Sequence, residues 1–433
     1  MIQSLTAIVG AAHVSTDRDV LAGRSVDWTG RYRGQAGALV RPGTAEEVAA
    51  VLAACREAGA HVTVQGGRTS LVAGTVPEHG DVLLSTDRLT EISTVDTAER
   101  RVRAGAGVTL AALQRAAAGA GLLFGVDLAA RDSATVGGMA STNAGGLHTV
   151  RYGPMSASVL GLEVALPDGT LLRRHPRTRA DNTGYDLAAL FVGAEGTLGV
   201  ITSVDLRLHP VPAHRATAVC GFDDLDALVA LARRFRDLSS VDALELIDGR
   251  ALEAASDWLL LVELAGDTDQ AGLLAAALDA VPTEPSVAID TAGRQRLWRL
   301  RESLTEIVAR FGPPLKFDVS LPLSAVARFA TASAELIAEQ APGAVPVLFG
   351  HIGEGNLHLN VLRCDIDREP AVYQAMMKLI GAHGGNVSSE HGVGTRKRAY
   401  LSMSRTAADI AAMRAIKAAF DPDGYLNAAV LFD

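Results

Sequence analysis

Three histidines and two glutamates stand in two glycine-punctuated stretches late in the sequence, FGHIGEGNLHLNV at 349–361 and SSEHGVG at 388–394. Period-two alternation places His358 and Asn360 on one face of a strand, and the turn before that strand can fold His351 back towards them. Two imidazoles and a carboxylate that leave coordination positions open suit Zn²⁺ or a similar divalent ion. The alternative is that each histidine is structural or exposed. The chain has only 11 histidines, so this grouping favours a metal site.

Two glycine-rich segments, 65–70 (QGGRTS) and 135–146 (TVGGMASTNAGG), indicate a second kind of chemistry. Glycines let the backbone approach a pyrophosphate closely and direct consecutive N–H groups at it. The alternative is a pair of tight turns with closely packed strands. A dinucleotide-binding βαβ motif is excluded because Gly105 and Gly107 are followed by VTL, so the third glycine is absent, and the sequence has no Walker A loop.

Two further segments carry cations that could bind an anionic substrate. Arg301 and Thr305 share one face of an expected helix, because they are four residues apart. Lys316 is a single lysine among apolar residues of an expected strand. The alternative is a solvated helix face and a lysine that extends its ammonium to water.

The elements that must position these residues alternate along the chain. Strands are expected at 37–40, 61–64, 81–85, 101–107, 199–208, 258–266, 315–320, 346–350 and 357–363, with a hairpin at 161–173. Helices are expected at 44–60, 109–118, 224–236, 270–280, 293–311, 369–383 and 406–420. This alternation predicts an α+β fold with mixed sheets.

The stretch HPVPA at 209–213 has the composition of a domain boundary. We therefore expect a first domain over 1–209 that contains both glycine-rich segments. A second, cap domain over 210–395 carries the expected metal and substrate residues. A C-terminal helical segment over 396–433 returns to the first domain.

Composition excludes several classes of protein. A formal net charge of -9 argues against a nucleic-acid partner, because phosphate binding needs a basic face. The three cysteines have no paired spacing, which favours a reducing compartment, and the N-terminal sequence lacks the features of a signal peptide. The sequence has no uninterrupted run of about 18 apolar residues, so we expect no integral membrane segment. We expect a cytoplasmic protein.

The first half of the sequence resembles the FAD domain of the vanillyl-alcohol oxidase/p-cresol methylhydroxylase superfamily, over about residues 34–210. The matching motifs are Arg41-Pro42, GGxTS at 66–70, AGAGV at 104–108, GGxxxTNAGG at 137–146, RYG at 151–153, LGLEV at 160–164, GYDL at 184–187 and LFxGAEGTLG at 190–199. Gln65 and Met139 depart from the common pattern, which has glycine and asparagine there. The resemblance implies a two-subdomain FAD-binding domain joined to an α+β cap domain.

This resemblance also implies which residues contact FAD. They are Gln65, Gly66, Gly67, Arg68, Thr69, Ser70, Gly137, Gly138, Thr142, Asn143, Gly145, Glu195, Gly196, Ile201 and Asn427. Relatives that attach the flavin covalently carry a histidine before the second glycine-rich segment. Residues 124–136, FGVDLAARDSATV, contain neither histidine nor cysteine. We therefore expect FAD to be held non-covalently.

The patterns GHxGxGNxHxN and SxEHGxG resemble those of FAD-dependent D-2-hydroxyglutarate dehydrogenases and their D-lactate dehydrogenase relatives. This implies His351, His358 and Glu390 as ligands of Zn²⁺ or Mn²⁺. Glu354, where Asp is commoner, is a departure that we do not assign to the metal. The resemblance further implies His391 as the catalytic base and Asn360 as a contact of the substrate's α-carboxylate. Arg301, Thr305 and Lys316 would then hold a distal carboxylate.

The expected activity is oxidation of a D-2-hydroxy acid to the 2-oxo acid, with D-2-hydroxyglutarate favoured because it has a second carboxylate. D-lactate or glycolate oxidation on the same scaffold is the alternative. A metallohydrolase and a non-catalytic flavin-binding module are the rivals from other classes. The electron acceptor would be an electron-transfer flavoprotein or a quinone, and a homodimer is possible.

Overall fold

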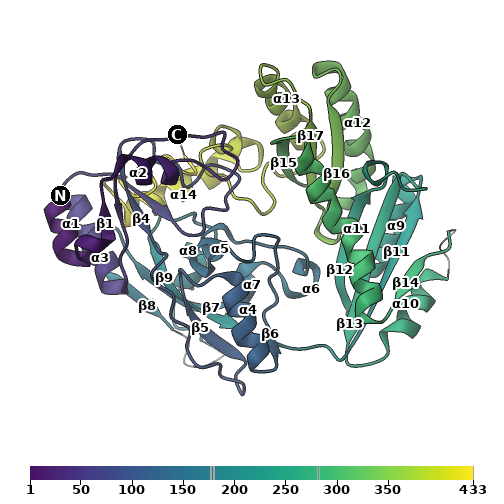
Figure 1. The fold of residues 1–433 in the computed structure, drawn as a ribbon, viewed down its shortest axis with the longest axis horizontal. Coiled ribbons are helices and arrows are strands. Elements are labelled where there is room, and N and C mark those ends of the chain that lie inside the picture. The colour runs from purple at the N-terminus through teal and green to yellow at the C-terminus, as the bar shows by residue number, and fades with distance from the viewer. Residues whose placement is uncertain (176–177, 179–180, 280, 282, 433) are drawn as a thin grey trace. The chain divides into compact units, whose positions relative to one another are not determined.

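The computed structural model describes residues 1–175, 178, 181–279, 281 and 283–432 (Figure 1). The chain forms two compact units. Unit 1 contains residues 1–145, 153–211 and 390–433, and unit 2 contains residues 146–152 and 212–389. Within the described residues, no helix combines the length and the apolar character needed to span a bilayer.

Unit 1 is built around two four-stranded sheets and a short two-stranded ribbon. The first sheet has the order β1-β2-β4-β3, formed by β1 (Val14–Ser15), β2 (Ala36–Val40), β4 (Asp81–Ser85) and β3 (Val62–Gln65). The second has the order β5-β9-β7-β8, formed by β5 (Arg101–Gly105), β9 (Val200–Arg207), β7 (Val159–Ala165) and β8 (Leu171–Arg174). The ribbon pairs β6 (Leu122–Leu123) with β10 (His209–Pro210).

Strands β2, β4 and β3 are parallel, and helix α3 (Ala45–Glu57) connects β2 to β3. The Thr44 side chain caps α3 by accepting the N–H of Glu47 at 3.1 Å. The Glu47 carboxylate accepts the N–H of Gly43 at 2.6 Å. The buried face of α3 packs on the sheet through residues that include Val48 and Leu52. This crossover places the 65–70 segment at the carboxyl end of β3.

The remaining helices of unit 1 are mostly short. They are α1 (Ile2–Val9), α2 (Arg18–Arg24), α4 (Leu110–Gly119), α5 (Val136–Thr142), α7 (Met155–Ser158), α8 (Leu187–Phe191) and α14 (Ala407–Phe420), with 3₁₀ turns η1 (Ala11–His13) and η5 (Arg398–Met403). After α14, the chain returns to β3, where the N–H of Val62 bonds to the carbonyl of Tyr425 and the N–H of Asn427 bonds to the carbonyl of Val62.

Unit 2 contains a seven-stranded sheet of order β14-β11-β13-β12-β16-β17-β15 (Figure 1). Its strands are β11 (His214–Phe222), β12 (Val241–Asp248), β13 (Trp258–Gly266), β14 (Ser286–Ala288), β15 (Leu315–Ser320), β16 (Val345–His351) and β17 (Asn356–Leu362). All pairings in this sheet are antiparallel. The helices and 3₁₀ turns are α6 (Thr149–Tyr152), α9 (Leu225–Arg236), α10 (Gln270–Leu278), α11 (Thr291–Arg310), α12 (Val326–Gln340), α13 (Glu369–Ala382), η2 (Arg250–Leu252), η3 (Leu323–Ala325) and η4 (Ile352–Glu354).

Helix α11 lies across one face of this sheet, with Leu304 and Val308 packed against Ile247 and Leu261. Polar contacts add to this packing, because Arg294 and the indole N–H of Trp298 both reach the buried carboxylate of Glu263. The same helix therefore combines an apolar and a cationic contact with the sheet. A buried carboxylate is stable only when such partners compensate its lost hydration.

A short piece of chain, residues 146–152, belongs to unit 2 although its sequence neighbours on both sides belong to unit 1. Arg151 in α6 bonds to the carboxylate of Asp242 at 3.2 Å and to the carbonyl of Ala265 at 2.6 Å. His148 Nδ1 lies 3.3 Å from the Asp242 carboxylate, and Arg215 also pairs with it. Asp242 has no exposed surface, so the guanidinium groups of Arg151 and Arg215 stabilise its charge.

The sequence predictions of fold class and of most elements are confirmed. Strands β11 and β12 and helix α12 were not assigned from the sequence, and β12 carries a residue that is central to the candidate site.

Candidate functional site

The two glycine-rich segments lie against each other in unit 1. A Cβ on Gly66 would stand 2.5 Å from Thr135 Oγ1, and one on Gly67 would stand 1.9 Å from the carbonyl oxygen of Ser133. A Cβ on Gly137 would stand 2.5 Å from the Cβ of Ala106. Only glycine permits these approaches, so the glycines let the backbone of the two segments pack closely together.

Several residues predicted to contact FAD adopt left-handed backbone conformations without being glycine. The φ angles are 55° at Arg68, 51° at Asn143, 51° at Glu195 and 45° at Asn427. Each such residue costs conformational energy of order 1–3 kcal/mol, and such residues cluster at functional sites. Their concentration in the predicted cofactor segments supports a functional role for this part of unit 1.

Side chains in these segments hold the backbone in place. Asn427 accepts the N–H of Val64 at 2.8 Å and donates to the carbonyl of Glu195 at 2.7 Å, so it joins β3 to the 195–199 segment. Asn143 accepts the N–H of Ser156 at 2.8 Å. These side-chain amides therefore hold the backbone of the predicted cofactor segments in place.

The Gln65 amide donates to the carbonyls of Arg24 and Thr75, at 2.8 and 2.9 Å. The Thr142 hydroxyl donates to the carbonyl of Gly138 at 3.1 Å. Unit 1 also contains the other predicted cofactor residues, namely Thr69, Ser70, Gly145, Gly196 and Ile201.

In unit 2, one face of the seven-stranded sheet carries three of the predicted residues, His358, Asn360 and Lys316. His358 on β17 lies directly opposite Asp318 on β15, and Asn360 lies directly opposite Lys316. Directly paired residues, and residues two apart on one strand, share a face of the sheet. Lys316, Asp318, His358 and Asn360 therefore form a compact polar group. Burial lowers the pKa of Lys316, whose ammonium is partly removed from water.

Glu245 on β12 is the centre of a buried polar network on this face. Its carboxylate, which has no exposed surface, lies 2.6 Å from Nδ1 of His351 and accepts the Nε–H of Arg301 at 2.6 Å. Arg301 also lies over the ring of Phe349, 4.5 Å from its centroid. Burial acts to raise the pKa of Glu245, but His351 and Arg301 outweigh it and lower the pKa below its ordinary value.

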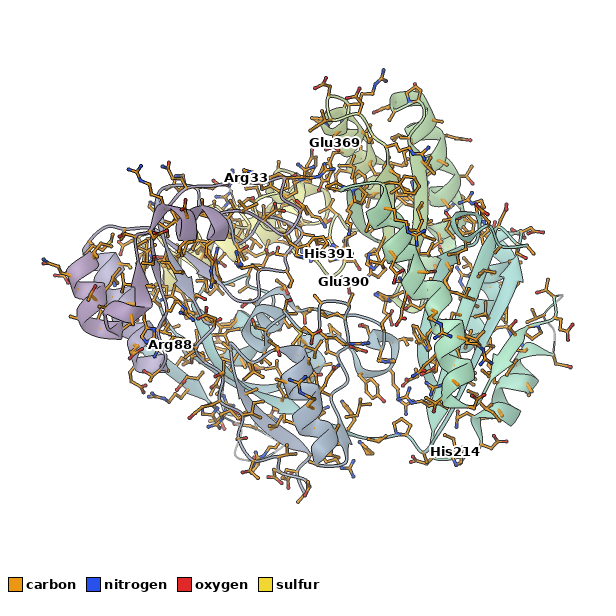
Figure 2. The ribbon with its side chains drawn as sticks, viewed as in Figure 1. Arg33, Arg88, His214, Glu369, Glu390 and His391 are labelled. Atoms are coloured by element: carbon orange, nitrogen blue, oxygen red, sulfur yellow. The ribbon has the colours of Figure 1, made fainter. Side chains whose placement is uncertain are left out.

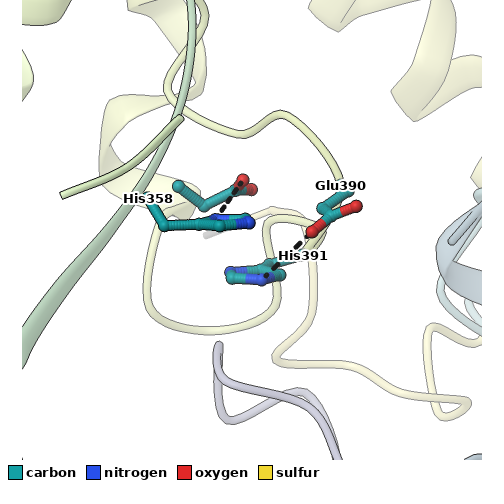
Figure 3. A group of neighbouring side chains, drawn as sticks. His358, Glu390 and His391 are labelled. Carbon is teal, nitrogen blue, oxygen red and sulfur yellow. Dashed lines mark ion pairs between the residues drawn. The ribbon is translucent and has the colours of Figure 1, made fainter. Parts of the chain in front are cut away.

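Four side chains form a group whose ligand atoms all lie within 4.8 Å of one another. They are Asp318, His358, Glu390 and His391 (Figure 3). His391 Nε2 lies 3.8 Å from Glu390 Oε1, and His358 Nδ1 lies 4.0 Å from Asp318 Oδ1. Figure 2 labels Glu390 and His391 on their shared loop. Two imidazoles and two carboxylates are a donor set that fits Zn²⁺ or Mn²⁺.

The chain just before Glu390 is fixed by strand β15. The N–H of Asn386 bonds to the carbonyl of Ser320, and the N–H of Ser389 bonds to Oδ2 of Asp318 at 2.9 Å. Asp318 is thus both a member of the four-residue group and an anchor for the segment that supplies Glu390. We did not single it out from the sequence, although its alternation with Lys316 in LKFDVS was the available signal.

The structure brings His358 and Glu390 of the predicted ligand set together. The ring centroid of His351 lies 5.3 Å from that of His358, but His351 is not a member of the four-residue group. Arg301 is buried, and Thr305 on the same helix is exposed. Glu245 was missed because the strand that carries it was not assigned.

Comparison with known proteins finds a matching family model for each half of the chain. Residues 36–174 match the family described as "FAD binding domain", and residues 211–431 match "FAD linked oxidases, C-terminal domain". The mitochondrial D-2-hydroxyglutarate dehydrogenase of Bos taurus is 36% identical, over 96% of this chain and 80% of its own length. The D-2-hydroxyglutarate dehydrogenase of Stutzerimonas stutzeri is 33% identical, over 100% of this chain and 98% of its own.

A putative mitochondrial D-lactate dehydrogenase of Schizosaccharomyces pombe is 32% identical, over 97% of this chain and 86% of its own length. Among solved structures, 4-ethylphenol oxidase from Gulosibacter chungangensis shares the fold with a TM-score of 0.80 at 18% identity, covering 100% of this chain and 96% of its own. The chain belongs to the FAD-linked oxidase family and is an FAD-dependent dehydrogenase.

Proposed function

We propose that the protein oxidises D-2-hydroxyglutarate to 2-oxoglutarate with non-covalent FAD and a divalent metal, Zn²⁺ or Mn²⁺. The observation that carries this proposal is the gathering of Asp318, His358, Glu390 and His391 within 4.8 Å. The names of the relatives in cattle and Stutzerimonas stutzeri support the choice of substrate.

His351, His358 and Glu390 would hold the metal, and Asp318 is a further candidate. The bond between Nδ1 of His351 and Glu245 supports this assignment, because a ligating histidine usually gives its other ring nitrogen to a carboxylate. Bound there, the metal would act as a Lewis acid that lowers the pKa of the substrate hydroxyl.

His391 would take the proton from that hydroxyl, since an imidazole can act as a general base near neutral pH. Asn360, buried and directly opposite Lys316, would donate a hydrogen bond to the α-carboxylate. FAD, when bound, supplies the acceptor for the hydride that leaves Cα.

Lys316 and Arg301 would bind the distal carboxylate of the substrate, with Thr305 as a weaker candidate because it is exposed. Arg301 Nε is already bonded to Glu245, so the remaining guanidinium N–H groups would make this contact. A guanidinium that is fixed by a buried carboxylate is preorganised to bind a second anion.

Steady-state kinetics on D-2-hydroxyglutarate, D-lactate and glycolate, each with and without a chelator, tests the proposal. We expect the highest kcat/KM with D-2-hydroxyglutarate, loss of activity on chelation, and its return with Zn²⁺ or Mn²⁺. A preference for D-lactate would favour the alternative that the Schizosaccharomyces pombe relative suggests. Full activity in the presence of the chelator would refute the metal's role.

A further inference from the structure

Glu195 makes a contact that its place in a flavin motif does not explain. One oxygen of its carboxylate accepts the N–H of Val393 at 2.8 Å, and the other accepts the N–H of Gly394 at 2.7 Å. These two amides follow Glu390 and His391 in the chain, separated from them by Gly392. A carboxylate that accepts two adjacent backbone N–H groups fixes the orientation of the peptide units that carry them.

Glu195 binds the turn formed by Gly392, Val393 and Gly394. The two glycines of this turn have no side chains that could stabilise it. Gly392 and Gly394 have φ angles of 84° and 54°, in the region that other residues rarely adopt. A Cβ on Gly394 would stand 2.1 Å from the carbonyl oxygen of Val72, and one on Gly392 would stand 3.0 Å from Glu195 Cδ. The turn therefore depends on its neighbours for its shape.

Those neighbours also belong to unit 1. The carbonyl of Val72 accepts the N–H of Thr395 at 3.1 Å, and the carbonyl of Gly394 accepts the N–H of Leu431 at 3.1 Å. The Glu195 carboxylate adds two hydrogen bonds to these backbone contacts. Without its carboxylate, the amides of Val393 and Gly394 would lose the acceptors to which they bond.

The backbone of Glu195 is itself fixed, so its carboxylate has a defined position. Its N–H bonds to the carbonyl of Ser141 at 2.8 Å, and its carbonyl accepts the side-chain amide of Asn427 at 2.7 Å. Its φ angle of 51° would cost a glycine nothing. A glutamate at such a position indicates that the side chain has a use that outweighs the strain.

We propose that Glu195 is a positioning residue, which fixes the Gly392–Gly394 turn and through it directs Glu390 and His391 to the metal and the substrate. The inference rests on the proposed function for the roles of those two residues. It gives the Glu195 side chain a task beyond the cofactor contact predicted from the sequence.

The test compares Glu195→Gln and Glu195→Asp with the wild-type flavoprotein. The Gln variant keeps the shape but directs an NH₂ group at one backbone N–H, and the Asp variant keeps the charge but is one methylene shorter. Asp81→Asn is the matched control, because Asp81 is a buried carboxylate of unit 1 that accepts the N–H of His79 at 3.0 Å and the hydroxyl of Thr63.

Affinity for Zn²⁺ is measured on metal-stripped protein by competition with a chelator, together with flavin content and kcat. For Glu195→Gln we expect metal binding about 10- to 100-fold weaker, as for other residues that support a metal ligand, with a reduced kcat and the flavin retained. Glu195→Asp should recover part of the loss. Asp81→Asn should lose fold stability without loss of metal affinity. Metal affinity and kcat equal to those of the wild type in both Glu195 variants would overturn the inference.

A second measurement separates this inference from the proposed function. Hydrogen exchange of the peptide that covers residues 388–397 should be faster in Glu195→Gln than in the wild type or in Asp81→Asn. If the wild-type protein binds no metal, the proposed metal-assisted function is refuted. The positioning role of Glu195 is then tested by hydrogen exchange and kcat alone. Unchanged exchange and unchanged kcat would refute it.

Discussion

Arg301 donates its Nε–H to Glu245 at 2.6 Å, and neither side chain has more than a small exposed surface. This pair joins helix α11 to strand β12 inside unit 2. Since the same carboxylate bonds to His351, the residue predicted to bind substrate and a residue predicted to bind metal share one anchor.

Replacing Glu245 by alanine should destabilise the protein strongly. Arg301 would stay buried without its carboxylate partner, and breaking a buried ion pair in this way costs about 3–5 kcal/mol. Denaturant unfolding measures the change in the free energy of unfolding. The exposed Glu339→Ala on α12 is the control and should change it little. Equal stability of the two variants would contradict the importance of the pair.

Acid should weaken the fold through Glu263. Burial acts to raise the pKa of this carboxyl, but Trp298 and Arg294 outweigh it and lower the pKa from 4.5 to about 2. Because the pKa in the folded protein lies below that of the unfolded chain, the stabilisation is complete above the unfolded value and is lost as the pH falls towards 2.

This contribution amounts to about 3 kcal/mol, taking 1.36 kcal/mol for each pKa unit. We expect the free energy of unfolding of Glu263→Gln to fall less steeply over this acidic range than that of the wild type. Denaturant titrations at several pH values measure the slopes. Parallel curves would show that Glu263 titrates normally in the folded protein.

Lys316 should distinguish dicarboxylate from monocarboxylate substrates. Lys316→Met keeps most of the length of the side chain but removes its charge. A lost charge-assisted hydrogen bond of about 1.5–3 kcal/mol lowers kcat/KM for D-2-hydroxyglutarate roughly 10- to 150-fold. The value for D-lactate should change little. Equal losses on both substrates would place the lysine outside the site of the distal carboxylate.

His391→Ala should lose the general base while FAD stays bound. Such a group typically contributes about 10²- to 10⁴-fold to the rate. Turnover and the flavin absorbance of the purified protein are the measurements. His214→Ala, an exposed histidine at the start of β11, is the control and should keep its activity. Near-normal turnover of His391→Ala would remove the assignment of the base.

Flavin should leave the protein on denaturation. Residues 124–136 contain no histidine or cysteine that could form the covalent bond found in some relatives. Acid precipitation followed by absorbance of the supernatant tests this prediction. Flavin that stays with the precipitated protein would contradict it.

Local patterns were sufficient to predict much of this molecule. The alternation in LHLNV predicted that His358 and Asn360 share a face, and the register of β15 with β17 agrees with that. The strand VDALELID over Val241–Asp248 was missed because Asp242, Glu245 and Asp248 make a fully buried strand look polar. The cations that compensate Glu245 and Asp242 come from distant parts of the sequence, as Arg301 does for Glu245 and Arg151 does for Asp242. The contact of Glu195 with Gly394 also joins distant parts of the sequence, so no local pattern could predict it.

The assignment of residues 146–152 to unit 2 has a consequence for dissecting the protein. A fragment cut at the Pro212 and Ser389 boundaries would contain every strand of the seven-stranded sheet and still lack α6. Asp242 would then lose its contacts with His148 and Arg151 and keep its ion pair with Arg215. In the isolated fragment, the buried carboxylate of Asp242 would be poorly compensated. Expression of this half alone should therefore include residues 146–152 or replace Asp242 by a neutral residue.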